Sequence, residues 1–449
     1  MAKKYKAKKR TATLHVVSKS SIWIFSISVL LAKILWLSSL PGKGVLGADG
    51  ENYLEGLSGL LRDGLFSSQG KLLYWPAGYP ILMWPFAEIS TQHFAFTVGI
   101  FQSILFSISV GYFVIELSKT NLSKFSFPIL VLLNLNPTLA LNSPAIGYEI
   151  PCASLFIISI SALLRHRRLH VDNQKVFSRY TILASISLAL SSFMQPRMLL
   201  LAIVILVPFA WMSFKGKSLV YFLAFTIGII AIAPVSLVAR NKVANDTIAV
   251  STNLGVTMNI GAGPDSTGGY TNQATGVPCK QTSENVSKRD QQLVRCVVNW
   301  YMENPAKTVR LFWNKLIFHW SPWFGPLANG TMARSPWLDY HPLSDVVSTP
   351  TGEKLINGLV GKTASWLWEI FSVMLIVVGF VALNRLGGTA RLLSWILFLP
   401  TLFNTLSSMA TIGDNRFRLP TMTLSLQLQL MGLVFILGKS YFKTLSDRD

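Results

Sequence analysis

Two carboxylates separated by one residue, Asp49 and Glu51, follow the first long hydrophobic segment of the chain. A carboxylate can take a proton from a hydroxyl group that lies within hydrogen-bond reach. We therefore predict that Asp49 acts as a general base at a membrane surface, with Glu51 beside it. A simpler interpretation is that Asp49 caps a helix, because its oxygens can accept backbone N–H bonds there. The two interpretations are compatible.

A third carboxylate, Glu149, stands in Gly147-Tyr148-Glu149-Ile150-Pro151 at the head of another apolar segment. An ionisable group at membrane depth is costly, and it is therefore a candidate for function. The alternative is that its charge favours the N-terminus of a helix. The sequence leaves both interpretations open, and we keep Glu149 as a candidate for positioning a substrate.

Two arginines, Arg416 and Arg418, lie in the turn Gly413-Asp414-Asn415-Arg416-Phe417-Arg418. The expected topology puts this turn outside, where the positive-inside rule disfavours basic residues. The planar guanidinium group suits phosphate oxygens, so we predict that both arginines bind phosphate. The alternative is an ion pair with Asp414 or with another loop carboxylate.

Several other kinds of chemistry find no motif in this chain. The six histidines lack metal-ligand spacing, and there is no Walker loop, serine elbow or paired-cysteine zinc signature. A nucleotide-driven pump and a zinc protease are therefore unsupported. We expect no cofactor: the arginines can take the place of a divalent metal ion, so none is required, although the two nearby carboxylates leave a divalent metal as an alternative.

The elements that must position these residues are membrane helices. Of the 449 residues, 51% are hydrophobic and 13% are charged, whereas soluble domains typically carry about 25% charged residues. We predict an all-α polytopic membrane protein. Its apolar segments are expected at residues 21–40, 93–117, 125–142, 150–164, 178–195, 198–213, 218–239, 363–384, 391–410 and 419–438, about ten in all.

The net charge of +20 comes largely from basic clusters in short connections between these segments. This pattern predicts a cell-membrane protein with both termini on the cytoplasmic side. The positive charge therefore calls for no nucleic-acid partner. We predict a basic tail (1–20), a transmembrane module with outer loop (21–239, loop 41–92), an extracytoplasmic domain (240–362), C-terminal transmembrane helices (363–438) and a second tail (439–449).

Two of the predicted outer segments have internal structure. Residues 53–65 repeat leucines at helical spacing, which predicts an interfacial helix that ends at Gly64. Residues 240–362 are too long for a structureless loop, so we expect a small mixed domain there. It contains Cys279 and Cys296, which could form a disulfide on an oxidising face or remain as two free thiols.

Three separated stretches of the chain resemble one family, the GT-C glycosyltransferases, which include protein mannosyltransferases and aminoarabinose transferases of lipid A. The stretches are Asp49-x-x-x-Tyr53 with Gly64 and Pro76-Ala77-Gly78-Tyr79-Pro80; Ser251-Thr252-Asn253-Leu254-Gly255 with Asn259-Ile260-Gly261 and Gly268-Gly269-Tyr270; and Gly413-Asp414-Asn415-Arg416-Phe417-Arg418-Leu419-Pro420. Their order and expected membrane side agree with this family across nearly the whole chain.

The resemblance implies transfer of a sugar from a polyprenyl-phosphate donor to a hydroxyl of an outer-face glycan, glycolipid or protein. Asp49 maps to the catalytic carboxylate. Many members have adjacent Asp and Glu, whereas this chain has Asp49-Gly50-Glu51. Expected sugar- or donor-binding residues are Glu51, Tyr53, Trp75, Tyr79, Glu149, Arg416 and Arg418. The rival interpretation is a non-catalytic transporter or lipid flippase, although we find no internal repeat of the kind that many transporters show.

Overall fold

Long apolar helices dominate the computed structural model, which describes residues 18–39, 44–46, 49–170, 175–269, 276–320 and 359–438. Most of the tail predicted at 1–20 and all of that at 439–449 lie outside these ranges. The helices are α1 (Lys19–Ser39), α2 (Gly50–Asp63), α3 (Gly78–Glu88), α4 (Phe94–Leu117), α5 (Ser126–Leu135), α6 (Pro137–Asn142), α7 (Glu149–His170), α8 (Arg179–Met194), α9 (Met198–Ser213), α10 (Gly216–Asn245), α11 (Leu254–Ile260), α12 (Val286–Glu303), α13 (Pro305–Trp320), α17 (Leu359–Arg385), α18 (Gly388–Ala410) and α19 (Leu419–Leu437).

Within the described residues, seven helices are long and apolar enough to cross a membrane. They are α1, α4, α7, α10, α17, α18 and the segment Asn415–Leu437 that contains α19. Ser123–Leu135 and Met198–Ser213 are shorter apolar helices. These helices support an all-α multi-pass membrane protein in a lipid bilayer, while the expected total of about ten crossings stays a prediction.

One predicted segment, 125–142, is divided into α5 and α6. The break falls at Asn136, whose side chain accepts a hydrogen bond from the backbone N–H of Leu139 and so caps α6. Pro137 follows at the first position of α6, where its missing N–H is harmless, whereas within a helix it would remove a hydrogen bond. The sequence therefore starts a new helix here.

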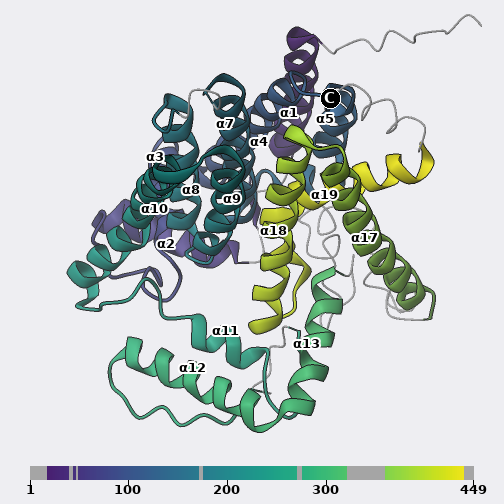
Figure 1. Ribbon diagram of the computed structural model, residues 1–449. Helices are drawn as coiled ribbons and strands as arrows, with labels where there is room; N and C mark the ends of the chain where they lie inside the picture. The colour runs from purple at the N-terminus through teal and green to yellow at the C-terminus, as the bar shows by residue number, and fades with distance from the viewer. Residues whose placement is uncertain are drawn as a thin grey trace, which may run out of the picture.

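The helix α7 lies at the centre of the bundle (Figure 1). In α7, 89% of the most apolar window is buried, against 22% in α1 and 28% in α10. It packs against α4, α8 and α19. The outer helices expose apolar side chains, as expected for surfaces that lipid covers. Glu149, the first residue of α7, therefore begins the most enclosed helix among these spans.

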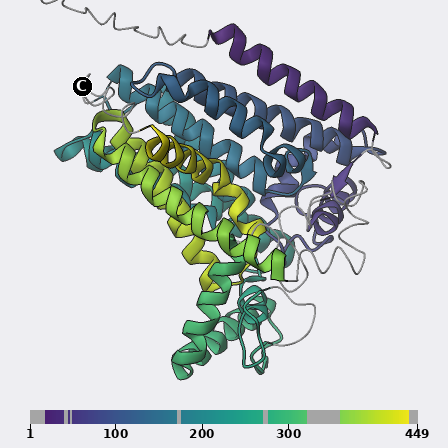
Figure 2. The same ribbon diagram turned by 90° about the vertical axis from the view of Figure 1, so that its right-hand side faces the viewer.

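The helices α11, α12 and α13 project beyond one end of the bundle, as Figures 1 and 2 show. A disulfide joins Cys279 to Cys296 of α12. In the described part of 240–362, the helices α11, α12 and α13 alternate with non-helical segments, and Gly269 forms a bridge with Gly413. The expected small mixed domain stays a prediction. The helix α10 continues to Asn245, past residue 239, where the predicted span ends. In that extension Arg240 donates hydrogen bonds to the carbonyls of Leu65 and Ser67, beyond the end of α2.

Gly78, in the Pro-Ala-Gly-Tyr-Pro stretch, allows α3 to touch α8. A Cβ at this position would lie 1.8 Å from the carbonyl oxygen of Phe193. We expect Gly78→Ala to lower the free energy of unfolding by about 1–3 kcal/mol or more, because the backbones must separate. Gly228→Ala in α10 is the matched control, since a Cβ there meets nothing within 4 Å and alanine favours helix. Equal thermal stability of the two variants would contradict this account of Gly78.

Candidate active site

A short parallel strand pair brings the two candidate carboxylates together. In this pair β1 (Val45–Leu46) lies beside β2 (Ala145–Ile146), with Val45 opposite Ala145 and Leu46 opposite Ile146. Parallel strands advance in the same direction. Asp49 comes three residues after β1, and Glu149 comes three residues after β2. The helices α2 and α7 then start at Gly50 and Glu149. Residues that are a hundred positions apart thus meet at the starts of two helices.

Arg416 lies between these carboxylates. Its Nη2 is 2.7 Å from Oδ2 of Asp49, and its Nε is 3.3 Å from Oε1 of Glu149. The side chains are mostly buried, with 13% of Arg416, 19% of Asp49 and 11% of Glu149 exposed. We call these three residues the acid–arginine group. Two carboxylates facing one guanidinium give it a net charge of −1.

The structure shows how Asp49 stands with respect to the helix-capping interpretation, whereas its role as a general base stays a prediction. Asp49 occupies the N-cap position of α2, but its side chain makes no capping hydrogen bond. Its carboxylate contacts Arg416 instead. A cap alone therefore does not account for an aspartate at this position. If a substrate displaced the Arg416 guanidinium or also bound to it, the Asp49 carboxylate at the start of α2 could accept a proton.

The turn that carries Arg416 is anchored to the α11–α13 region. The side chain of Asp414 accepts a hydrogen bond from the backbone N–H of Arg416 at 2.9 Å. The backbone N–H of Gly413 donates to the carbonyl of Gly268, also at 2.9 Å. Gly413 passes so close to α13 that a Cβ would lie 2.5 Å from the Cα of Lys315. The glycines of two family-like stretches therefore join them directly.

Arg418 does not join the acid–arginine group. It is 3% exposed, and its Nη1 donates a hydrogen bond to the carbonyl of Trp320 at 2.8 Å. Residues 415–418 form a 3₁₀ helix, in which positions two apart point to different sides because a turn takes three residues. The two arginines therefore contact different partners, and the prediction that they bind phosphate stays a prediction.

Arg197 is a cation near the group that the sequence analysis missed. Its Nη2 donates to the hydroxyl of Tyr148 at 2.8 Å. Its guanidinium carbon lies 4.2 Å from the ring centre of Phe417, the residue after Arg416. The available signal was Gln195-Pro196-Arg197, a charged break between two apolar runs, which predicted a helix boundary and nothing more. The formal charges of Asp49, Glu149, Arg416 and Arg197 sum to zero.

The predicted aromatic residues form a buried wall beside the acids. The ring of Tyr53 is 4.9 Å from Tyr79, 6.2 Å from Tyr148 and 6.1 Å from Trp75. Burial raises the pKa of Tyr53 well above its usual value, and the nearby negative charge of Asp49 and Glu149 adds to this. The hydroxyl of Tyr53 therefore keeps its proton and can donate it in a hydrogen bond.

The hydroxyl of Tyr79 is engaged in the fold, and Glu51 lies away from the group. The hydroxyl of Tyr79 donates to Oε1 of Gln102 at 2.7 Å and accepts from the N–H of Gly147 at 2.9 Å, so Tyr79 holds the 145–149 segment in place. Glu51 is exposed on α2 and is not brought to the acid–arginine group. Trp75 is partly buried and stays available at the edge of the wall. No cluster of three metal-binding side chains occurs in the described ranges.

Lys315 of α13 supports the turn from the opposite side. Its side chain is fully buried, and its Nζ donates to the carbonyl of Thr411 at 2.7 Å and to the hydroxyl of Tyr301 at 2.8 Å. Desolvation lowers the pKa of Lys315 from 10.5 to about 7. Lys315 therefore links α12, α13 and the start of the Arg416 turn at the cost of burying an amine.

The depressed pKa of Lys315 predicts a pH-dependent stability. Between pH about 7 and 10.5 the unfolded chain binds a proton at Lys315 that the folded chain does not, so stability rises as pH rises through this window. The wild type should gain ~1.4 kcal/mol per pH unit relative to Lys315→Met, measured by unfolding at pH 7.5 and 9.5. Lys307→Met, an exposed lysine on the same helix, is the control and should follow the wild type. Parallel curves for Lys315→Met would contradict the prediction.

The geometry defines what the site can do. It holds two carboxylates at the starts of two helices, two guanidinium groups and a tyrosine hydroxyl, on a wall of aromatic rings. Such a set can accept a proton and can stabilise a developing negative charge.

Comparisons of the chain with family models, with curated proteins and with solved structures found no match.

Proposed function

We propose that this chain is a membrane glycosyltransferase of the GT-C type, which uses a polyprenyl-phosphate sugar as donor. The observation that carries the proposal is the convergence of Asp49 and Glu149 on Arg416. Two of the stretches that resemble the family supply Asp49 and Arg416, and the third binds the same turn through Gly268. The three stretches that resemble the family thus contact one another in space, which supports the proposal.

In the proposed reaction, an acceptor hydroxyl attacks the anomeric carbon of the donor sugar. A new glycosidic C–O bond forms while the bond from that carbon to the phosphate oxygen breaks, with inversion at the carbon. Asp49 takes the hydroxyl proton, and polyprenyl phosphate leaves with the bonding electrons. Arg416 and Arg197 stabilise the negative charge that develops on the leaving phosphate. Glu149 holds Arg416 in place, and no metal ion is required.

We place this chemistry on the outer face of a cell membrane, with both termini inside. Basic residues crowd the connections expected on the cytoplasmic side. The disulfide between Cys279 and Cys296 suits an oxidising compartment. The acceptor is a glycan, a glycolipid or a protein of that face.

The test is transfer by the purified full chain in proteoliposomes that contain polyprenyl-phosphate sugars and an envelope glycan fraction. We expect polyprenyl phosphate to be released in an acceptor-dependent manner, and the glycan to gain the mass of one sugar. A transporter or flippase, the second candidate, would instead move the intact donor between leaflets. Movement without release of polyprenyl phosphate would overturn the proposal.

A further inference from the structure

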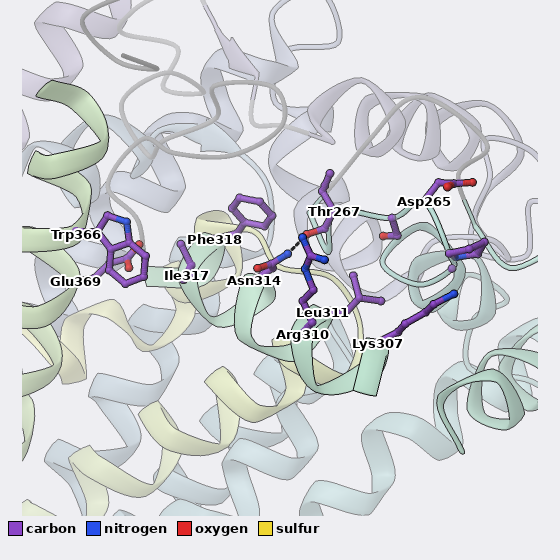
Figure 3. Close-up of a pocket in the computed structure, with 13 residues that line it drawn as sticks. Asp265, Thr267, Lys307, Arg310, Leu311, Asn314, Ile317, Phe318, Trp366 and Glu369 are labelled. Atoms are coloured by element: carbon purple, nitrogen blue, oxygen red, sulfur yellow. Dashed lines mark hydrogen bonds between the residues drawn. The ribbon is translucent and has the colours of Figure 1, made fainter. Parts of the chain in front are cut away.

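A cavity of about 520 Å³ lies away from the acid–arginine group. It is bounded by the loop 263–267, by one side of α13 and by the beginning of α17 (Figure 3). None of Asp49, Glu149 and Arg416 lines it. A volume of this size is typical of small-molecule sites, and the proposed sugar transfer gives it no role.

The cavity is apolar at one end and basic at the other. Figure 3 shows Ile317, Phe318 and Trp366 on one side and Lys307 and Arg310 on the other. Ile317 lies seven positions after Arg310 in α13, which is about 10 Å along a helix. Asn314 lies between the two ends and donates a hydrogen bond to the carbonyl of Thr267 at 3.2 Å.

The apolar end continues onto a lipid-type surface. Beyond Trp366, α17 exposes large apolar side chains, and three of them, Ile370, Val373 and Val377, follow Trp366 at helical spacing on one face. Residues Trp366–Arg385 form one of the candidate membrane spans. A hydrocarbon chain that lies along this face would therefore enter the cavity at its apolar end, with its headgroup directed towards Lys307 and Arg310.

The charges of the lining favour an anion at the solvent end. Lys307 and Arg310 are exposed, and neither forms a salt bridge within the described part of the chain. The lining also contains two carboxylates, Asp265 and Glu369. Glu369 is 7% exposed and lies beside Trp366, at the largely apolar end and away from Lys307 and Arg310. Asp265 then leaves one surplus positive charge.

We propose that this cavity binds the phosphate headgroup of a membrane lipid, whose hydrocarbon chain lies against α17. Three features of the cavity fit such a lipid. Its apolar end continues onto a candidate membrane span, its basic end lies about 10 Å away, and the side-chain amide of Asn314 lies between the two ends. The guanidinium of Arg310 and the ammonium of Lys307 bind the phosphate oxygens. This lipid site is separate from sugar transfer, and its test does not depend on transfer.

The test uses the full chain in neutral detergent, with lipid binding followed by native mass spectrometry. The probes are dioleoyl phosphatidic acid, dioleoylglycerol (which has the same chains without the phosphate) and inorganic phosphate. We expect the wild type to bind phosphatidic acid at least tenfold more tightly than either other probe. The double variant Lys307→Gln/Arg310→Gln should lose on the order of tenfold in affinity for phosphatidic acid. Trp366→Ala should weaken binding of phosphatidic acid without affecting unfolding.

The matched control is Lys288→Gln/Arg295→Gln, which removes the same two charge types from exposed positions of α12. It should keep its affinity for phosphatidic acid within twofold. Equal loss in both double variants would show a non-specific charge effect and overturn the site. Unchanged binding in Lys307→Gln/Arg310→Gln would also overturn it. If inorganic phosphate binds as tightly as phosphatidic acid, the ligand is a free anion and the lipid assignment is wrong.

Discussion

Asparagine in place of Asp49 is expected to lower the rate of glycosyl transfer by about 10²–10⁴-fold, the usual contribution of a general base. The amide has nearly the size of the carboxylate but cannot take the acceptor proton. The fold should persist, because Arg416 keeps Glu149 as a partner. Donor binding should therefore stay within a few-fold of the wild type. The measurement is single-turnover release of polyprenyl phosphate, together with a separate donor-binding titration.

Glu51→Gln is the matched control for Asp49→Asn. Glu51 lies two residues further along the same loop and helix, carries the same charge and is exposed. Its replacement should leave the transfer rate within twofold of the wild type. A transfer rate that survives Asp49→Asn would sink the assignment of the base. If both variants lose activity equally, the effect is one of loop charge and not of proton transfer.

The helices could be predicted from the sequence because they depend on local composition. Long apolar runs must form helices in a bilayer to satisfy their backbone hydrogen bonds, and α4, α9 and α18 start and end close to the expected positions. Gly64 also ends α2 as expected, with a positive φ of 78°. The number of membrane crossings could not be predicted from the apolar pattern, because a short apolar helix can either cross the bilayer or pack inside the helix bundle.

The site depends on pairings that local patterns do not encode. The two-residue strands β1 and β2 align Asp49 with Glu149, and such short strands carry no recognisable alternation. The different directions of Arg416 and Arg418 follow from a 3₁₀ turn, whereas the sequence shows only two arginines. Arg197 enters through the packing of α8 and α9. The family resemblance identified Asp49 and Arg416 separately, but not their contact.

Methionine in place of Arg416 is expected to lower the free energy of unfolding by about 3–5 kcal/mol, as in other proteins that lose one member of a mostly buried ion pair. The substitution leaves Asp49 and Glu149 facing each other without the cation that contacts both. Transfer activity should also be lost, because the developing phosphate charge has one guanidinium fewer. The measurement is unfolding in mixed detergent micelles, with transfer assayed at a temperature where the variant is folded.

A double-mutant cycle separates the ion pairs from the size of the side chain. If the loss arises from unpaired carboxylates, Arg416→Met should cost less in an Asp49→Asn/Glu149→Gln background, with a coupling of ~0.5–3 kcal/mol. Arg416→Lys should be intermediate in stability, because a single ammonium cannot face both acids in the manner of a planar fork. Equal costs of Arg416→Met in the two backgrounds would mean that the three residues do not act as a unit. In that case the geometric argument for the site would fail, even if Asp49→Asn is inactive.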